Sequence, residues 1–361
     1  MSLAPSIVET LARARSDLRM GVPVVLAGPQ GCAVVAAAET LSAERLGDMR
    51  SLGEPVLAIT ARRAQTLKAR AYDGDLARIV LPGDAGIDWV ANMADPSDDF
   101  AMPLKGPHQS MRGGDAGLHR AALRLAKSAR LLPAMVVVDI SVQGFAAAHG
   151  LTEVDVLAAD AELDALSPLH RIISARVPLQ VSEAGRLHVF RPEDGSEEHY
   201  AVEIGQPDRN TPVLTRLHSA CFTGDLLGSL KCDCGPQLRA ALRHMGDAGA
   251  GVLLYLSQEG RGIGLANKMR AYSLQDQGFD TVEANHRLGF EDDERDFRVG
   301  AEILKRLGFS QIRLLTNNPA KVDMMQANDV TVVERVPLKV GLNPLNAGYL
   351  DTKAKKSGHI L

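Results

Sequence analysis

Three of the four cysteines in the chain stand close together. Cys221, Cys232 and Cys234 share one short segment, whereas Cys32 lies alone in an apolar stretch. In a reducing compartment, clustered thiolates suit Zn²⁺ better than a disulfide framework, which is typical of small secreted domains. Structural zinc sites usually have four protein ligands, and catalytic sites have three with one position left open. Three cysteines therefore favour a catalytic zinc site, although His218 could complete a structural site and the thiols could simply be buried.

Two loops carry residue types that bind anions. The stretch 257–264 is rich in glycine and joins an apolar strand to a helix, so its backbone N–H groups can face a phosphate. Arg261 within it can donate two hydrogen bonds to that phosphate. In the second loop, Thr316 and Lys321 stand at a helix start and can hold a phosphate or a base edge. Each loop could also be no more than a tight turn.

An acidic run at 289–296 stands between these loops. Such a run is usually a solvent-exposed helix start whose carboxylates complement the helix dipole. The functional interpretation is a carboxylate base beside an arginine. His286, just upstream, is interpreted as structural.

The hydrophobic pattern predicts the elements that must position these residues. The first half alternates strands and helices, which predicts an α/β domain. Its Gly-, Pro- and Asp-rich stretch at 82–114 predicts an irregular loop. The expected strands are 23–26, 55–60 and 135–140, and the expected helices are 43–51, 61–70 and 118–131.

The pattern of predicted strands and helices changes near residue 172, where we place a domain boundary between 1–172 and 173–361. Short strands separated by turn clusters come first and predict antiparallel pairing. Alternating helices and strands follow, so the second domain is expected to be α+β or α/β. The expected strands are 179–182, 187–190, 200–204, 213–217, 251–256, 312–316 and 330–334, and the expected helices are 237–248, 265–277, 295–307 and 320–327.

Composition excludes several classes of protein. The 361 residues carry a net charge of −4, so no global basic field attracts nucleic acid, and aromatic residues make up only 4%. The apolar runs are too short for a membrane span of about 20 residues. The first residues form an amphipathic helical pattern and not a signal sequence. We therefore expect a cytoplasmic protein that binds neither nucleic acid nor a membrane.

Residues from about 178 to 361 resemble GTP cyclohydrolase II, a zinc enzyme that opens the guanine ring of GTP at the start of riboflavin synthesis. The matching motifs occur in the family's order and with similar spacing. They are 216–219, 221–225, 229–235, 258–261, 267–272, 293–297 and 315–319.

The resemblance implies a reaction and a role for each matching residue. The reaction is zinc-dependent hydrolysis of GTP to 2,5-diamino-6-(5-phospho-D-ribosylamino)pyrimidin-4(3H)-one, formate and pyrophosphate, with Mg²⁺ on the triphosphate. Cys221, Cys232 and Cys234 would hold one zinc ion, and a homodimer is expected. The residues implied to contact GTP are Arg216, Leu217, His218, Ser219, Ala220, Gln237, Glu259, Gly260, Arg261, Thr316 and Lys321.

Three further residues are implied to be catalytic. Asp293 matches the family's general base, and Arg295 matches its assigned nucleophile. Because an arginine has a pKa above about 12, we expect Arg295 to stabilise charge on the phosphate instead. Tyr272 matches a tyrosine that accompanies the full reaction, since relatives that lack it stop at the formamide. Its presence implies complete ring opening and deformylation.

Some positions depart from the family's pattern. Ala220 stands where the family often has glutamate, and Gly262 stands where asparagine is frequent. Leu256 and Ser257 replace a common His-Arg pair. These departures concern affinity and rate more than the type of reaction.

Residues from about 6 to 172 resemble a degenerate 3,4-dihydroxy-2-butanone 4-phosphate synthase domain. The segments 21–26, 34–39 and 121–140 follow that family's outline, but its acidic Mg²⁺-binding cluster is replaced by neutral residues at 27–32. Mg²⁺ is usually bound through carboxylate oxygens, and the side chains of residues 27–32 include no carboxylate. We expect an inactive domain that serves as a scaffold, dimer interface or regulator.

Three functions therefore compete. The first is a GTP cyclohydrolase II with an inactive partner domain. The second is a bifunctional enzyme that also makes 3,4-dihydroxy-2-butanone 4-phosphate, which the missing acidic cluster disfavours. The third is a non-catalytic zinc- and nucleotide-binding regulator, which the retained cysteines and catalytic candidates disfavour.

Overall fold

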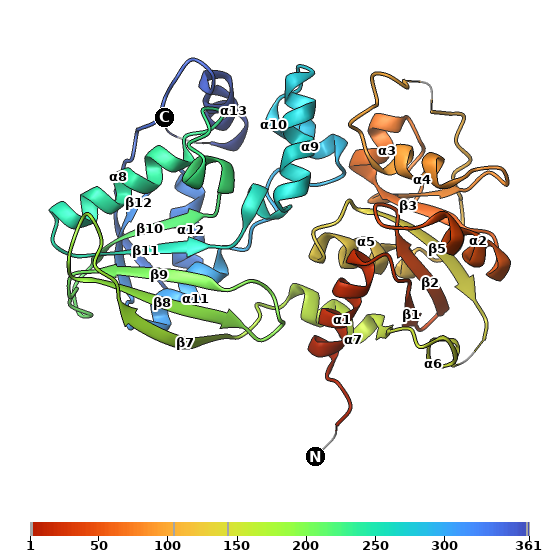
Figure 1. The fold of residues 1–361 in the computed structure, drawn as a ribbon, viewed down its shortest axis with the longest axis horizontal. Coiled ribbons are helices and arrows are strands. Elements are labelled where there is room, and N and C mark those ends of the chain that lie inside the picture. The colour runs from red at the N-terminus through yellow and green to blue at the C-terminus, as the bar shows by residue number, and fades with distance from the viewer. Residues whose placement is uncertain (1–2, 104, 143, 359, 361) are drawn as a thin grey trace. The chain divides into compact units, whose positions relative to one another are not determined.

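A computed structural model describes residues 3–103, 105–142, 144–358 and 360. By their internal contacts the residues form two compact units (Figure 1). Unit 1 comprises Met1–Ala165 and Ala266–Glu294, and unit 2 comprises Leu166–Leu265 and Arg295–Leu361. A segment from the C-terminal half thus groups with the N-terminal half. The two-domain, mixed α/β class is confirmed, while the boundary at 172 stays a prediction.

Unit 1 is built on a six-stranded sheet with the order β4-β3-β5-β2-β1-β6. Neighbouring strands are antiparallel except β1 and β6. Runs of valine and isoleucine form the central strands because branched side chains pack well on a buried sheet. The strands are β1 Val24–Gly28, β2 Gly31–Ala37, β3 Val56–Thr60, β4 Leu76–Val80, β5 Ala134–Ile140 and β6 Glu153–Asp155.

Amphipathic helices complete unit 1. Helix α5 packs a stripe of alanine and leucine into the core that also contains the strands, and α1 begins at a capping box formed by Ser6 and Glu9. The helices are α1 Ile7–Arg19, α2 Ala43–Leu52, α3 Ala61–Leu67, α4 Ile87–Ala94, α5 Gly117–Ser128, α6 Phe145–His149, α7 Val156–Asp164, α9 Leu265–Asp276, whose first residue belongs to unit 2, and α10 Thr281–Arg287.

Unit 2 contains a seven-stranded sheet with the order β13-β12-β10-β11-β9-β8-β7. The four strands β13, β12, β10 and β11 are parallel to one another, whereas β9, β8 and β7 each pair antiparallel with the strand before them in this order. The strands are β7 Leu169–Arg176, β8 Gly185–Pro192, β9 His199–Ile204, β10 Val213–Ser219, β11 Gly251–Leu256, β12 Gln311–Leu315 and β13 Thr331–Val336.

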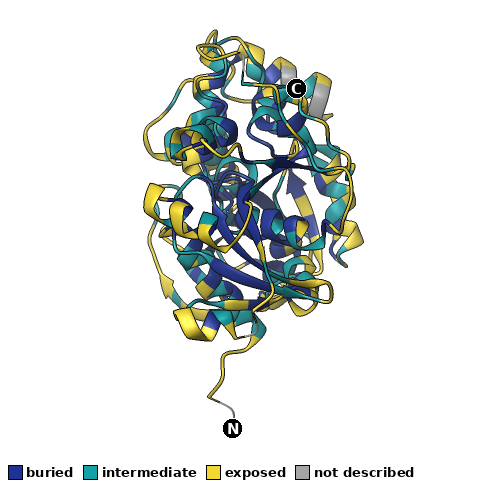
Figure 2. Ribbon diagram, turned by 90° about the vertical axis from the view of Figure 1, so that its right-hand side faces the viewer, coloured by how far each residue is buried: buried dark blue, intermediate teal, exposed yellow. Residues whose placement is uncertain are grey.

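Helices cover both faces of the parallel part of this sheet. Residues of α8 Cys234–Asp247 pack with Leu214 in one core cluster, whereas residues of α11 Arg298–Arg306 and α12 Pro319–Ala327 pack with Leu217 in another. Strand residues alternate between the two faces, as the period of two requires. Figure 2 shows the buried residues concentrated on the strands. Helix α13 Ala347–Ser357 lies near the end of the chain.

The order of the strands gives unit 2 a topological switch point between β10 and β12. The connection from β10 leads through α8 to β11 on one side, while β12 lies on the other side of β10 and leads away through α12 to β13. Loops that leave neighbouring parallel strands in opposite directions open a crevice at the carboxyl ends of those strands. The segments after β10 and β12 are those whose residue types suggested metal and phosphate binding.

Several expected elements were wrong or missed. No strand forms at 179–182, where Leu179 and Ser182 make only an isolated bridge, because the antiparallel series begins earlier with β7. The stretch 82–114 is not irregular throughout, since it contains α4. Strands β2, β4, β6 and β7 and helices α6, α7, α10 and α13 were not predicted. Short or glycine-bounded elements carry too little periodicity to be recognised.

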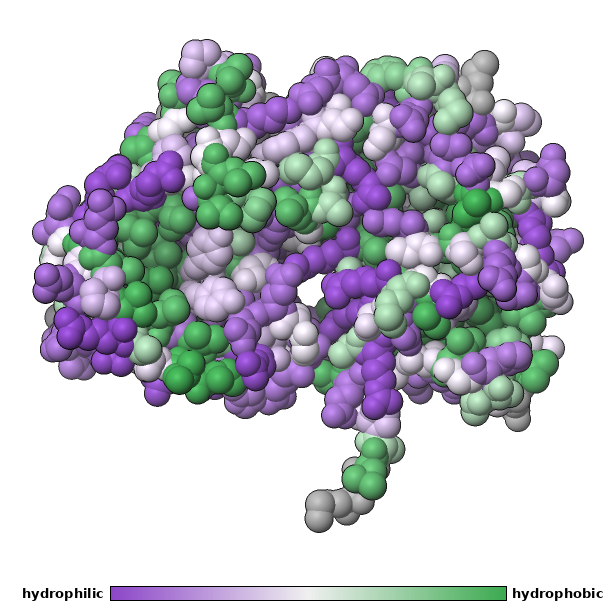
Figure 3. All heavy atoms as spheres, viewed as in Figure 1, coloured by the Kyte–Doolittle hydropathy of each residue, from purple (hydrophilic) through white to green (hydrophobic). Residues whose placement is uncertain are grey.

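Among the described residues, no helix is long and apolar enough to cross a membrane. Figure 3 shows hydrophilic and hydrophobic residues intermixed on the viewed face.

Candidate functional site

The three cysteines expected to bind metal lie together at the carboxyl end of β10. Cys221 comes two residues after β10, and Cys232 and Cys234 stand where α8 begins. Their sulfur atoms lie within 4.8 Å of one another, and the Sγ atoms of Cys221 and Cys232 are 3.7 Å apart. Within the described part of the chain, this is the only group of three or more His, Cys, Asp or Glu side chains close enough to hold a metal ion.

Gly224 leaves room for the sulfur atoms. A Cβ atom at this position would lie 2.7 Å from Sγ of Cys232 and 3.0 Å from Sγ of Cys221. The backbone N–H of Gly224 donates a hydrogen bond to Sγ of Cys221 at 3.3 Å. The π-helical turn Phe222–Leu226 brings this backbone against the thiols. Glycine is required here because of the close approach.

The cluster fits a zinc ion chemically. The hydrogen bond with Cys221 raises the pKa of Cys232 to about 11, and burial adds to the increase. Like charges this close repel one another, so three thiolates need a cation beside them. Zinc binds cysteine as the thiolate, so binding is expected to release these protons. Soft sulfur donors packed around a backbone N–H suit Zn²⁺.

Asp225 is the centre of a hydrogen-bond network beside the cysteines, and sequence reasoning gave it no role. Its Oδ2 accepts hydrogen bonds from the backbone N–H of Cys221 at 3.0 Å and from the hydroxyl of Tyr255 at 3.1 Å. Both carboxylate oxygens lie 3.0 Å from Nε2 of His218. The carboxylate therefore fixes the turn that carries Cys221. Its spacing of four residues from Cys221 was the available signal.

His218 faces this carboxylate and is not part of the thiol cluster. Its side chain is buried, burial lowers the pKa of His218, and its Nδ1 has no hydrogen-bond partner among the described residues. The geometry does not favour the closed structural site in which His218 is the fourth ligand.

The guanidinium of Arg216 is buried between β10, β12 and α8. It donates hydrogen bonds to the carbonyl oxygen of Leu315 at 2.9 Å and to Oε1 of Gln237, whose Nε2 donates to Asp233. Burial lowers the pKa of Arg216, although Asp233 opposes the shift. Its Nε has no partner within the described residues. A buried guanidinium with an unused donor is suited to an anion.

Two further cations flank the ring of Phe297. The guanidinium carbon of Arg295 lies 4.6 Å from the ring centroid, and Nζ of Lys321 lies 4.7 Å from it. Arg295 donates a hydrogen bond to Oγ of Ser219 at 3.3 Å, and Lys321 donates one to the carbonyl oxygen of Leu217 at 3.3 Å. Both contacts lie at the end of β10. Together with Arg216 on β10, Arg295 and Lys321 concentrate positive charge beside the cysteines.

The glycine-rich loop after β11 forms a tight turn, Glu259–Gly262. Gly260 and Arg261 adopt left-handed φ angles of 65° and 61°, a strained conformation for Arg261. Glu259 accepts hydrogen bonds from the backbone N–H groups of Phe222 at 2.6 Å and Gly260 at 3.0 Å. Glu259 thereby ties this loop to the turn after Cys221.

The loop after β12 presents the start of α12. Thr316 is buried, and its hydroxyl accepts a hydrogen bond from the backbone N–H of Asn318 at 3.0 Å. The side chain of Asn318 in turn accepts one from Ala320 and caps the helix. Because β12 is parallel to β10, this arrangement places the N-terminus of α12 and Lys321 near the carboxyl end of β10.

Three of the residues implied to contact GTP, Leu217, Ala220 and Gly260, offer no polar side chain. Leu217 is 1% exposed and packs in the core, where a Cβ on Gly300 would lie 2.7 Å from its Cδ2. Ala220 donates its backbone N–H to Leu256 at 2.7 Å. Any contact that Leu217 makes with a nucleotide is thus limited to its backbone.

The remaining catalytic candidates belong to unit 1. Tyr272 lies on α9, and Asp293 is an exposed residue that follows α10. Nζ of Lys268 lies 5.6 Å from the centroid of the Tyr272 ring. Both candidates fall in the segment Ala266–Glu294, whereas Arg295 begins the next stretch of unit 2.

Comparisons with known proteins follow this geometry. A family model described as GTP cyclohydrolase II matches residues 170–337. A GTP cyclohydrolase-2 from Azospirillum brasilense is 44% identical over 360 residues, covering 96% of this chain and 93% of its own length. Another, from Actinobacillus succinogenes, is 53% identical over 198 residues, covering 54% of this chain and 90% of its own.

Among solved structures, a two-domain 3,4-dihydroxy-2-butanone 4-phosphate synthase from A. baumannii is 18% identical, with a TM-score of 0.34, and the match covers 91% of this chain and 99% of that one.

Proposed function

The chain belongs to the GTP cyclohydrolase II family, and we propose that it hydrolyses GTP to the diaminopyrimidine ribosyl phosphate, formate and pyrophosphate in riboflavin biosynthesis. The relative from Azospirillum brasilense aligns with nearly the whole chain, so membership does not rest on an isolated motif. The observation that carries the proposal is the cysteine cluster around Gly224, with three cations beside it at the end of β10.

We propose that Cys221, Cys232 and Cys234 hold one Zn²⁺ ion. When bound, zinc supplies a water molecule whose pKa is lowered toward about 7, which suits hydrolysis of the guanine ring. Asp225 positions Cys221 by accepting a hydrogen bond from its backbone N–H, and Tyr255 and His218 hold the Asp225 carboxylate in place.

The cations of unit 2 are proposed to bind the triphosphate. Arg216 offers an unused donor, and Arg295 and Lys321 are held in place by the ring of Phe297. Arg295 would stabilise charge on the phosphate as pyrophosphate leaves, since its guanidinium stays protonated and is a poor nucleophile. Mg²⁺ would neutralise the remaining phosphate charge. Near-normal pyrophosphate release by the variant Arg295→Lys would refute a dedicated role for the guanidinium.

The family resemblance assigns proton transfer to Asp293 and complete deformylation to Tyr272, and both assignments are part of this proposal. The other implied contacts, through Ser219, Ala220, Gln237 and the loops at 259–261 and 316–321, belong to it as well. A cytoplasmic location suits thiols that must stay reduced, and a homodimer is proposed from the resemblance.

One assay separates the competing functions. The zinc-loaded protein is incubated with GTP and, separately, with ribulose 5-phosphate. We expect formate and pyrophosphate from GTP and no product from ribulose 5-phosphate. Turnover of both substrates would favour the bifunctional enzyme, and GTP binding without turnover would favour the regulator.

A matched pair of variants tests the metal site. Cys221→Ser should abolish both zinc retention and GTP turnover, because one of three sulfur ligands is lost. Cys32→Ser removes a thiol in unit 1 and should leave zinc content and turnover unchanged. Equal zinc content in the two variants would contradict the assignment of the ligands.

A further inference from the structure

The segment Ala266–Glu294 carries Tyr272 and Asp293 and is held by side chains from the N-terminal half of the chain. The family motif at 267–272 contains two residues, Asn267 and Arg270, to which the proposed chemistry gives no role. Both anchor the segment. Asn267 is fully buried and donates a hydrogen bond to the carbonyl oxygen of Arg130 at 3.0 Å.

Arg270 is the main ionic anchor of α9. Its Nε donates a hydrogen bond to Asp95 at 2.7 Å, and its Nη1 lies 3.1 Å from a carboxylate oxygen of Glu39. The same Nη1 donates to Oδ1 of Asn267 at 2.8 Å. Burial disfavours the charged guanidinium, but Glu39 and Asp95 outweigh it and raise the pKa of Arg270. Arg270 is two residues from Tyr272, so these contacts set the rotation of the helix turn that carries the phenol.

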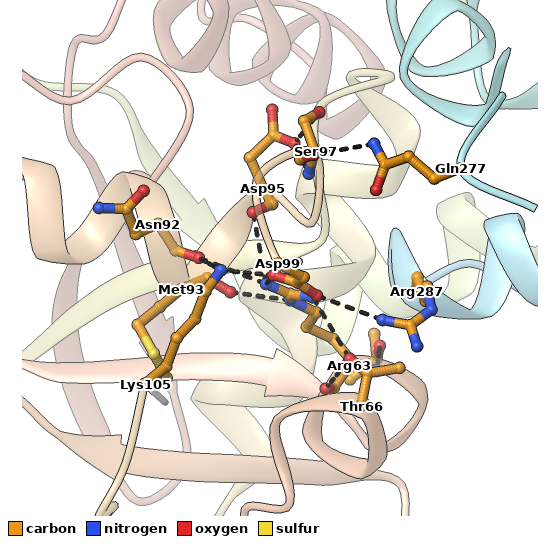
Figure 4. A network of polar contacts seen from close by, with 11 residues as sticks. Arg63, Thr66, Asn92, Met93, Asp95, Ser97, Asp99, Lys105, Gln277 and Arg287 are labelled. Atoms are coloured by element: carbon orange, nitrogen blue, oxygen red, sulfur yellow. Dashed lines mark hydrogen bonds and ion pairs between the residues drawn. The ribbon is translucent and has the colours of Figure 1, made fainter. Parts of the chain in front are cut away.

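The region after α9 is held by a second network, drawn in Figure 4. Gln277 donates a hydrogen bond to the carbonyl oxygen of Ser97 at 3.1 Å. Asp99 lies between Arg63, whose Nη2 donates to it at 3.0 Å, and Arg287 on α10, whose Nη1 is 3.5 Å away. The side chain of Arg63 is 1% exposed, whereas those of Asp99 and Arg287 are 12% and 25% exposed.

Three contacts hold the stretch beside Asp293. The hydroxyl of Thr60 donates a hydrogen bond to the carbonyl oxygen of Gly289 at 2.9 Å. Arg62 donates two hydrogen bonds to Glu291. Nζ of Lys127 lies 2.6 Å from Glu294, the residue that follows Asp293. Both catalytic candidates are therefore bracketed by contacts with the first 130 residues.

We propose that the N-terminal half acts in the cyclohydrolase reaction as a scaffold that positions Tyr272 and Asp293, with Arg270 and Asp95 as positioning residues. This inference rests on the proposed GTP hydrolysis and gives the degenerate half of the chain a specific task. Misplacement of a reacting group by about 1 Å can cost as much as 100-fold in rate, so loss of an anchor is expected to reach the chemistry.

The test uses the full-length, zinc-loaded protein and the variants Asp95→Asn and Lys127→Gln. Each replaces a charged anchor with a neutral side chain of similar size. The control is Asp160→Asn, which removes the 2.6 Å ion pair of Asp160 with Arg124 elsewhere in unit 1, at comparable exposure. Formate and pyrophosphate are both quantified as GTP concentration is varied, and thermal unfolding is recorded for every variant.

Because the tyrosine is implied to serve deformylation, Asp95→Asn should release less formate than pyrophosphate and accumulate the formamide. We expect kcat for formate to fall about 10-fold while KM for GTP stays within about twofold. Lys127→Gln should lower kcat for both products, and Asp160→Asn should change neither. General destabilisation would reduce both products in parallel with the folded fraction, so it cannot produce an unequal ratio.

Equimolar products with wild-type kcat in Asp95→Asn and Lys127→Gln would overturn the scaffold role. So would equal losses in Asp95→Asn and Asp160→Asn. A wild-type protein that does not turn over GTP would instead refute the proposed function, and the scaffold role would fall with it.

Discussion

Replacing Gly224 by alanine should weaken zinc binding without unfolding the protein. The added Cβ would lie 2.7 Å from Sγ of Cys232, 3.0 Å from Sγ of Cys221 and 3.0 Å from Cβ of Cys234. The first contact is about 1 Å shorter than the separation of roughly 3.5–4.0 Å at which nonbonded atoms attract most. All three ligands would have to move apart at once.

The size of the effect follows from the cost of overpacking, which is about 1–3 kcal/mol. When zinc fixes the three sulfur atoms, this strain remains in the bound state. Without zinc, the thiols of Cys221 and Cys232 can rotate away from the new methyl group, so the metal-free protein keeps most of its stability. At about 1.4 kcal/mol for each factor of ten, zinc affinity should fall about 5- to 150-fold.

The assay is competition for zinc between the protein and a chromophoric chelator, combined with chemical denaturation of the metal-free protein. Gly348→Ala is the control, because Gly348 lies on α13 with nothing within 4 Å of the added Cβ. It should leave zinc affinity unchanged and alter the unfolding free energy by no more than about 1 kcal/mol. A Gly224→Ala variant that binds zinc within twofold of wild type would refute the packing argument.

Two further substitutions test buried carboxylates. Asp225→Asn should lower GTP turnover and reduce the unfolding free energy by about 1–3 kcal/mol, because the amide cannot accept all the hydrogen bonds that Asp225 receives from Cys221, Tyr255 and His218. Denaturation and turnover assays check this, and an unchanged variant would contradict it. Asp99→Asn should reduce the unfolding free energy by about 3 kcal/mol at pH 7, because Arg63 would stay buried beside a neutral amide. Burial opposes ionisation of Asp99, but Arg63 and Lys105 outweigh it and lower its pKa. The stabilisation is therefore complete above the unfolded pKa of about 3.9 and is lost as pH falls through the lower folded pKa. Denaturation at pH 7 and below pH 4 should show the difference between variant and wild type shrinking with acid, and a difference that grew with acid would contradict this sign.

The segment Ala266–Glu294 links the C-terminal half of the sequence to the N-terminal half within unit 1. The relative from Actinobacillus succinogenes matches only 54% of this chain, whereas the one from Azospirillum brasilense matches 96%. In the present chain, the segment Ala266–Glu294 makes its described ion pairs with residues such as Glu39, Asp95 and Lys127. The N-terminal half is expected to be required for the proposed reaction if it carries these contacts.

The sequence by itself determined the chemistry that is available. The spacing of Cys221, Cys232 and Cys234 predicted one metal site, and the structure brings their sulfur atoms together. Hydrophobic periodicity located most strands and helices of the parallel region, because local patterns of burial repeat with the geometry of the element. The loops at 257–264 and 316–321 were likewise recognisable, since turn residues act through their own backbone.

Only the tertiary structure decided which distant residues meet. Asp225 gained its role from Tyr255 and His218, which come from two neighbouring parallel strands. Leu217 turned inward to the core although it lies in a motif implied to contact GTP. The anchors of Arg270 are separated from it by 231 and 175 residues. Such pairings depend on how elements pack, and no local pattern encodes them, so the sequence suggested candidate reacting groups and the fold decided which side chains hold them in place.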